Sequence, residues 1–336
     1  MLARMLDASR TLFASVVLAS MLGLVAGPSR ADDPAPSPEQ LTERTEELRS
    51  VWSTFQDNIA SLRFGIDERL VSAAVFDGAQ ARWFRTGFSV EGGGPVTDRF
   101  QIGASPTLAI ETLSFDGSDT FASSLLKGRS TRLGDFLDAA LRVGGNYRFD
   151  HGLGAELITS ASLRQERGAK FAESLTVGGS LGGTYRRGGW LRLRLGVGVG
   201  SDLGDGKLRV APVFRIQLRP HPDLMLETSG LKGLVAWDAS RRLQLALAGG
   251  LESTQYRLDR RRRPPAGLGS GALQRRQTRI GLEADYRIRS WLRVRGDVGV
   301  ALVQELTVLD EDGAEIDKRE ERDPSPLVGI RFEVQR

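Results

Sequence analysis

The chain has 336 residues, which is enough for one large domain or two ordinary ones. Its 46 Lys and Arg residues face 42 Asp and Glu residues, and the net charge of +4 gives no reason to expect a nucleic-acid partner. There is no cysteine, which excludes disulfides, thiolate metal sites and a cysteine nucleophile.

Residues 1–31 predict a secretory signal peptide. Arg4 and Arg10 precede an apolar run over residues 12–27, and the small residues Ser29 and Ala31 occupy the positions that a signal peptidase reads. Cleavage is predicted after Ala31. The alternative is an uncleaved membrane anchor, for which the run is near the shorter limit. We therefore expect an exported protein.

Residues 32–37 form a polar, proline-containing linker, and residues 38–63 predict an N-terminal amphipathic helix. Ser37 is a suitable N-cap, and Pro38 fits the first helical turn. Apolar residues recur from residue 48 to residue 62 with helical spacing. A single helix packed on the rest of the chain is the simpler interpretation, and a plug, a cap or an oligomerisation helix fits the same pattern.

From residue 69 to residue 336 the apolar residues recur with a period of two, which predicts strands. Short turns alternate along the chain with longer, more polar loops. The pattern indicates an all-β fold with 12–14 antiparallel strands rather than alternating strands and helices. The predicted strands are 69–76, 80–91, 97–114, 136–149, 152–166, 172–186, 190–200, 207–219, 223–229, 231–238, 242–257, 277–289, 291–308 and 325–335.

Three features favour a closed transmembrane β-barrel over a soluble secreted β-protein. Many alternating runs reach ~10 residues, the length that a tilted strand needs to cross a bilayer. Aromatic residues such as Trp190 and Trp291 gather near the short turns, as in an interfacial belt, whereas Tyr256 is the main candidate at the other end. Closure also removes the exposed edges of a large sheet.

With these features, the chain resembles bacterial outer-membrane β-barrels, in particular porin-like families of unknown function. Its last strand, LVGIRFEVQR over residues 327–336, adds to the resemblance. The resemblance implies a place in the bacterial outer membrane, with outer-membrane lipid and the barrel-assembly machinery as partners. Such barrels usually end on an aromatic residue, whereas this chain ends in Val334, Gln335 and Arg336.

Catalytic chemistry finds little support. His151 and His221 lie in predicted turns, and the Gly-Gly-Ser-Leu-Gly stretch at residues 178–182 lies within a strand rather than at a strand-to-helix turn. We therefore predict no enzyme activity, no catalytic residue, no metal site and no cofactor.

The polar residues that alternate with the apolar row are predicted to line the lumen. An excess of arginine there favours a passive channel for small polar or anionic solutes. The alternative is a non-conducting barrel whose long loops bind a partner or a surface glycan. The predicted lumen residues are Arg142, Arg148, Arg192, Arg194, Arg215, Arg279, Glu283, Asp285, Arg287, Arg293, Arg295, Asp297, Arg331 and Glu333.

Two further expectations concern individual charges. A tight turn joins strands 277–289 and 291–308, so Glu283 and Asp285 should lie close to Arg293 and Arg295. One long loop carries four consecutive arginines, which could bind lipopolysaccharide phosphates or form a solvated basic loop. These residues are Arg260, Arg261, Arg262 and Arg263.

Overall fold

The computed structural model describes residues 61–76, 79–116, 132–201, 203, 206, 208–259, 271–311, 313–321 and 323–335. The chain divides into two units, 1–41 and 42–336, and all the described residues belong to the second. The predicted signal peptide, the linker and residues 38–60 of the predicted helix lie outside the described residues.

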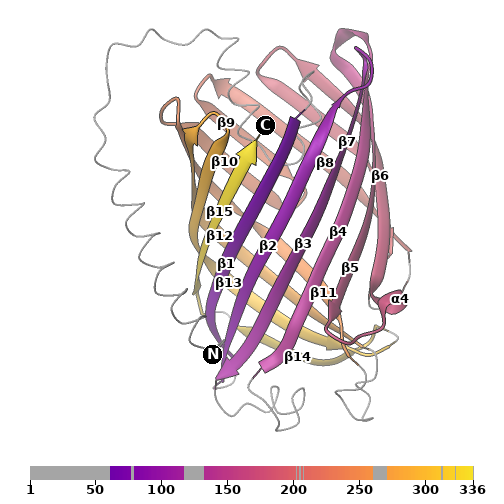
Figure 1. Ribbon diagram of the computed structural model, residues 1–336, viewed down its shortest axis with the longest axis vertical. Helices are drawn as coiled ribbons and strands as arrows, with labels where there is room; N and C mark the ends of the chain where they lie inside the picture. The colour runs from indigo at the N-terminus through magenta and orange to yellow at the C-terminus, as the bar shows by residue number, and fades with distance from the viewer. Residues whose placement is uncertain are drawn as a thin grey trace. The chain divides into compact units, whose positions relative to one another are not determined.

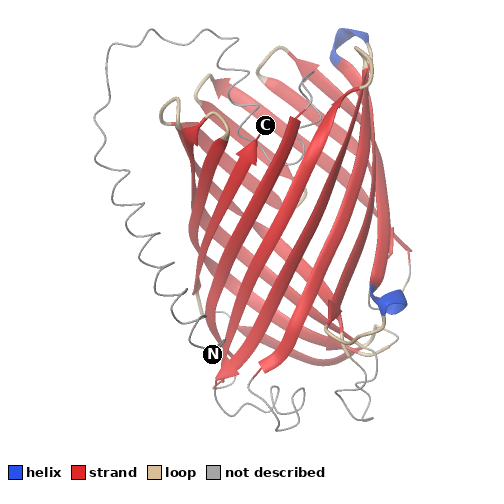
Figure 2. Ribbon diagram, viewed as in Figure 1, coloured by secondary structure: helices blue, strands red, loops and turns tan. Residues whose placement is uncertain are grey.

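The described residues form one antiparallel sheet that closes on itself, apart from one parallel contact (Figures 1 and 2). Its strands are β1 (Ser61–Phe76), β2 (Ala79–Pro95), β3 (Phe100–Asp116), β4 (Arg132–Arg148), β5 (Leu153–Glu166), β6 (Leu175–Arg187), β7 (Leu191–Ser201), β8 (Leu208–His221), β9 (Leu224–Ser229), β10 (Lys232–Asp238), β11 (Leu243–Arg257), β12 (Ala272–Arg289), β13 (Leu292–Leu309), β14 (Glu315–Glu321) and β15 (Ser325–Gln335). The short helices η1 (Asp150–Gly152) and α4 (Phe171–Ser174) lie between strands, and no helix of the described residues could cross a membrane.

Each strand from β1 to β13 pairs with the next in sequence, and the last strand, β15, pairs with β13 and with the first. β15 pairs with β1 from Arg63↔Gln335 to Val71↔Leu327, which closes the ring. β14 and β15 pair with successive parts of β13, so they share one place in the wall. The fifteen described strands therefore form a barrel with fourteen strand positions. The predicted closed antiparallel barrel is confirmed, at the upper end of the predicted strand number.

The first part of β1 corrects two predicted boundaries. Residues 61–63 belong to a strand rather than to the end of a helix, and the barrel begins at Ser61 rather than at residue 69. Leu62, Phe64 and Ile66 are exposed on the outer surface, and they alternate with the buried Arg63. Leu62 thus continues the period-two pattern of β1, although it also fits the helical spacing that precedes it.

Two other segments differ from the prediction. β14 lies in a segment predicted as a loop, where it pairs with β13 from Gln304↔Glu321 to Leu309↔Glu315. α4 occupies the predicted start of a strand, and β6 begins only at Leu175. Charged residues dominate β14, so its sequence lacks the apolar alternation that identifies the other strands.

The outer surface carries a broad apolar belt. On β7, Leu195, Val197 and Val199 are 63, 53 and 42% exposed, and they alternate with Gly196, Gly198 and Gly200. Trp190, Trp237 and Trp291 lie beside short turns and are about half exposed. Apolar side chains face outward and polar ones inward, which is the arrangement that a lipid environment requires.

The wall is incomplete on one side, toward the longer loops. The β9–β10 hairpin ends after the pair Lys232↔Gly250. Beyond it, within the described ranges, residues 208–214 of β8 and residues 251–256 of β11 have no strand between them. Gly250 has φ +157°, and a Cβ there would lie 2.6 Å from the Leu231 carbonyl oxygen. Glycine thus allows β11 to leave β10 at this point.

A pair of charged substitutions on β7 tests the position of the belt. Leu195→Arg, near the middle of the strand, should destabilise the folded barrel by about 2–4 kcal/mol, because a charge at the bilayer midplane is poorly solvated. Leu191→Arg, beside Trp190 at the strand end, should cost only about 0–1 kcal/mol. The measurement is urea unfolding in lipid vesicles. Equal losses for the two variants would show that this row does not cross the hydrocarbon.

Candidate functional site

The interior of the barrel holds the inward rows of all the strands. The strand register places the fourteen predicted lumen residues on these rows, where they alternate with outward apolar residues. They divide between two parts of the wall. Arg142, Arg148, Arg192, Arg194 and Arg215 lie on β4, β7 and β8. Arg279, Glu283, Asp285, Arg287, Arg293, Arg295, Asp297, Arg331 and Glu333 lie on β12, β13 and β15.

The second group belongs to a half of the interior that is filled with ion pairs. Arg295 lies 2.8 Å from Asp285, its cross-strand partner, and Arg331 lies 2.8 Å from Glu333. Glu283 is opposite Asp297 rather than an arginine. The Asp297 carboxylate lies 3.6 Å from Arg69. In this half the arginine charge is largely balanced by carboxylates, which gives a packed polar core.

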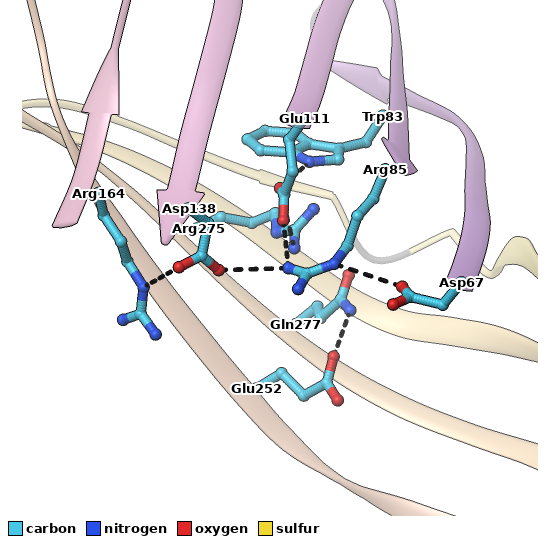
Figure 3. A network of polar contacts seen from close by, with 9 residues as sticks. All are labelled: Asp67, Trp83, Arg85, Glu111, Asp138, Arg164, Glu252, Arg275 and Gln277. Atoms are coloured by element: carbon cyan, nitrogen blue, oxygen red, sulfur yellow. Dashed lines mark hydrogen bonds and ion pairs between the residues drawn. The ribbon is translucent and has the colours of Figure 1, made fainter. Parts of the chain in front are cut away.

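Glu111 is the centre of the most deeply buried network, shown in Figure 3. Its side chain is fully buried, and its carboxylate lies 2.7 Å from Arg85 Nη1 and 3.8 Å from Arg275 Nη2. The indole nitrogen of Trp83 donates a hydrogen bond to the same carboxylate. Arg85 continues to Asp138 at 3.3 Å, so the network joins β2, β3, β4 and β12.

An apolar cluster closes the interior at the end with the longer loops. The rings of Trp83 and Phe136 stack with centroids 6.0 Å apart, and the Phe136 and Tyr256 centroids are 4.9 Å apart. Leu113, Leu258, Leu273 and Val308 are also buried in this cluster. The prediction that Tyr256 belongs to an outer aromatic belt is therefore wrong, because its side chain is fully buried inside the barrel.

The end of β11 reaches across the interior to the wall formed by β5. Arg257 pairs in parallel with Gln165 of β5, although β6 to β10 separate these strands along the wall. The Arg257 side chain donates hydrogen bonds to the carbonyl oxygens of Glu173 and Leu203. The backbone nitrogen of Asp259 donates to Glu166, at 2.8 Å. These contacts hold the end of β11 over the space enclosed by β5 to β8.

Beneath this crossing, β4 to β8 line a cavity of about 590 Å³. The inner faces of β6 and β7 carry Gly178, Gly198 and Gly200, which leave the space open. Gln255 of β11 and Gln274 of β12 lie on the other side of the cavity. The polar lining from the β4–β8 wall consists of Arg142, Ser160, Ser162, Arg164, Thr176, Ser180, Arg194, Ser201 and Arg209.

Sequence reasoning missed the inward aromatic residues. Trp83 and Phe136 share their rows with Arg85 and Asp138, two positions away in each strand, and this parity was the available signal. An aromatic residue near a strand end also fits an outer belt. Its position along the strand therefore predicts the outer face, whereas its place in the alternation predicts the inner face. The contact between β11 and β5 has no sequence signal, because it joins walls that are not neighbours.

The two histidines lie at turns, as the sequence predicts. His151 and His221 are exposed, at turns near strand ends. Within the described ranges, no group of three or more histidine and acidic residues could hold a metal ion. Arg260, Arg261, Arg262 and Arg263 lie outside the described residues.

No known family model and no curated protein matches the sequence. Several solved structures are similar to this chain at about one tenth sequence identity. An outer-membrane channel from Pseudomonas putida F1 has 10% identity and a TM-score of 0.45, covering 92% of this chain and all of that one. A Pseudomonas aeruginosa FadL homologue has 10% identity and a TM-score of 0.43, covering 87% and 93%. The Pseudomonas putida toluene transporter TodX has 12% identity and a TM-score of 0.39, covering 87% and 92%.

The structure itself defines the class of protein. A closed antiparallel sheet with an apolar outer face and a charged interior is a transmembrane β-barrel. Barrels of this kind lie in outer membranes. The protein is therefore an outer-membrane β-barrel, as its resemblance to that class predicts.

Replacement of the central carboxylate tests the buried network. Glu111→Gln should lower the free energy of unfolding by about 3–5 kcal/mol, because it removes the charge that buried guanidinium groups face. Asp150→Asn, in an exposed pair 3.2 Å from Arg99, should change it by only about 0–1 kcal/mol. Both variants are measured by urea unfolding in micelles. A decrease in the free energy of unfolding for Glu111→Gln no larger than that for Asp150→Asn would show that the buried network contributes little to stability.

Proposed function

We propose that the protein is a passive channel for small polar or anionic solutes through the part of the interior lined by β4 to β8. The observation that carries the proposal is the cavity of about 590 Å³ there, with Arg142, Arg194 and Arg209 in its lining. Serine and threonine hydroxyl groups line the same space, so the cavity is suited to hydrated polar solutes.

The charge of this lining favours anions. Asp138 and Glu156 are the carboxylates beside it, and they pair with Arg164 at 3.1 Å and with Arg194 at 3.4 Å. Arg142 is exposed to the cavity and has no ion pair with any described residue. A low-dielectric wall focuses the field of such arginines on the solute, which raises the local anion concentration.

The other half of the interior offers a poorer route. Arg295, Arg331 and Arg279 each lie within 3.0 Å of a carboxylate, so neighbouring carboxylates balance their charge. A solute would have to separate these pairs, whereas the glycines on the inner faces of β6 and β7 leave unfilled space. We therefore assign the solute path to β4 through β8 and a structural role to the ion pairs of β12, β13 and β15.

A non-conducting barrel that binds a partner or a surface glycan through its long loops is the second candidate. The observation that favours it is the closed mouth, where Trp83, Phe136 and Tyr256 pack together and β11 contacts β5. In either case we propose that outer-membrane lipid surrounds the apolar belt and that the barrel-assembly machinery inserts the chain. Lipopolysaccharide binding by residues 260–263 belongs to the second candidate.

Conductance in a planar bilayer tests the first candidate. The refolded barrel should give discrete current steps, and in a salt gradient its reversal potential should show a preference for chloride over potassium. The double variant Arg142→Gln, Arg209→Gln should lower the anion-to-cation permeability ratio by roughly twofold or more, because two lining charges are lost.

The matched control is Arg276→Gln, which removes an arginine from the outer face of β12, and it should leave the ratio unchanged. The absence of current steps from a barrel that shows heat-dependent gel migration would reject the channel and leave the non-conducting candidate. An unchanged ratio in the double variant would reject this lining as the source of selectivity.

A removable disulfide tests whether the end of β11 controls the path. The natural chain has no cysteine, so Gln165→Cys with Arg257→Cys introduces a single pair, at positions that face each other in the register. The oxidised barrel should conduct little, and reduction should restore the current, because the end of β11 covers the cavity. The same protein before and after reduction is its own control. Equal conductance in both states would show that solutes pass without movement of β11.

A further inference from the structure

A second, smaller cavity lies near the short-turn ends of β6, β7 and β8. Its volume is about 40 Å³, which is room for about three water molecules. Arg186, Arg192, Arg194 and Arg215 contribute guanidinium groups to its lining, and Glu156 contributes the one carboxylate in that lining. Arg194 lines the larger cavity as well, so the two spaces meet at this side chain.

The strand register places these arginines directly opposite one another. Arg186 of β6 faces Arg192 of β7, and Arg194 of β7 faces Arg215 of β8. Like charges in directly opposed positions destabilise a sheet. Two such pairs at consecutive inward positions of β7 therefore favour the presence of negative charge between them.

Two carboxylates lie close to these arginines. Glu156 lies 3.4 Å from Arg194, and Glu227 lies 2.9 Å from Arg215. In the filled half, the opposed arginines Arg295 and Arg331 each have a carboxylate at 2.8 Å. The smaller cavity differs from this opposed pair in that four arginines and one carboxylate line an open space.

The lining is chemically suited to an oxyanion. A guanidinium group presents a planar fork of N–H donors, which matches the oxygens of a phosphate or carboxylate group. Thr184 and Gln217 add a hydroxyl and an amide that can donate hydrogen bonds. The small volume favours a compact ion over an extended organic solute, and it leaves little space for a lipid chain.

We propose that these four arginines, the guanidinium site, bind a small free oxyanion such as inorganic phosphate at the short-turn end of the solute path. The inference rests on the proposed function to the extent that the ion reaches the site through the larger cavity. The bound ion places negative charge between the opposed arginines, and it makes this end of the path selective for oxyanions over chloride.

Calorimetric titration tests the site without measuring transport. The full refolded barrel in neutral detergent micelles is titrated with inorganic phosphate against a constant chloride background. The wild-type protein should show saturable binding near one ion per chain. Arg192→Gln should weaken phosphate binding by about tenfold or more, because it removes a charged donor. Arg186→Gln should act in the same direction, and Arg192→Lys should retain part of the affinity.

Arg187→Gln is the matched control. Arg187 is the next residue along β6, is exposed, and pairs with Leu191 on the outward row. Its replacement should leave phosphate binding unchanged. Heat-dependent gel migration checks that each variant has folded.

The results separate this inference from the proposed function. Saturable phosphate binding that Arg192→Gln abolishes, in a barrel without conductance, would support the guanidinium site and reject the channel. Conductance without saturable phosphate binding would reject the site and leave the channel. An equal loss of binding in Arg187→Gln and Arg192→Gln would also overturn the site, since it would indicate general attraction to positive charge.

Discussion

The constraint on which the rest of the structure depends is the hydrogen bonding of the backbone within lipid. The hydrocarbon offers no partner for a peptide N–H or C=O group, so a sheet that crosses it must close. Here the closing seam is the pairing of β1 with β15, from Arg63↔Gln335 to Val71↔Leu327. Once the ring is closed, alternation along each strand sends every second side chain to lipid and the others to the interior.

Closure makes the interior a space that side chains either fill or leave open, and this barrel does both. On β12, β13 and β15 the inward rows carry long charged side chains that pair with one another. Beside the larger cavity, the inward rows of β6 and β7 carry Gly178, Ser180, Gly198 and Gly200, which are too short to reach across. The distribution of side-chain length around the wall, rather than the number of strands alone, sets where a solute could pass.

The alternation of apolar and polar residues was sufficient to predict the closed antiparallel barrel and to assign side chains to its two faces. The pairing of Asp285 with Arg295 follows from one tight turn and a period of two, and such local pairing can be predicted. The filled and open halves could not be predicted, because they depend on which distant inward rows meet. Glu111 of β3 shows this well, because its partner Arg275 lies on β12.

Two errors have a common physical cause. Tyr256 was assigned to an outer belt and Leu62 to a helix, because an apolar residue near the end of an element fits more than one pattern. Position along the strand predicts an aromatic belt, whereas parity predicts the face, and the two disagree at Tyr256. The structure follows parity there: Tyr256 continues the inward row of β11 and packs against Phe136.

The incomplete wall and the closed mouth are two results of one local departure from regular pairing. The β9–β10 hairpin ends at the pair Lys232↔Gly250, so β11 loses its neighbour on that side. The backbone N–H and C=O groups at this strand edge have no neighbouring strand to bond to. The end of β11 instead contacts Gln165 and Glu166 across the interior. Because β11 turns inward here, Tyr256 lies against Trp83 and Gln255 lies beside the cavity. In the proposed channel, the short hairpin therefore affects access to the arginine-lined space as well as the continuity of the wall, although it carries none of the arginines itself.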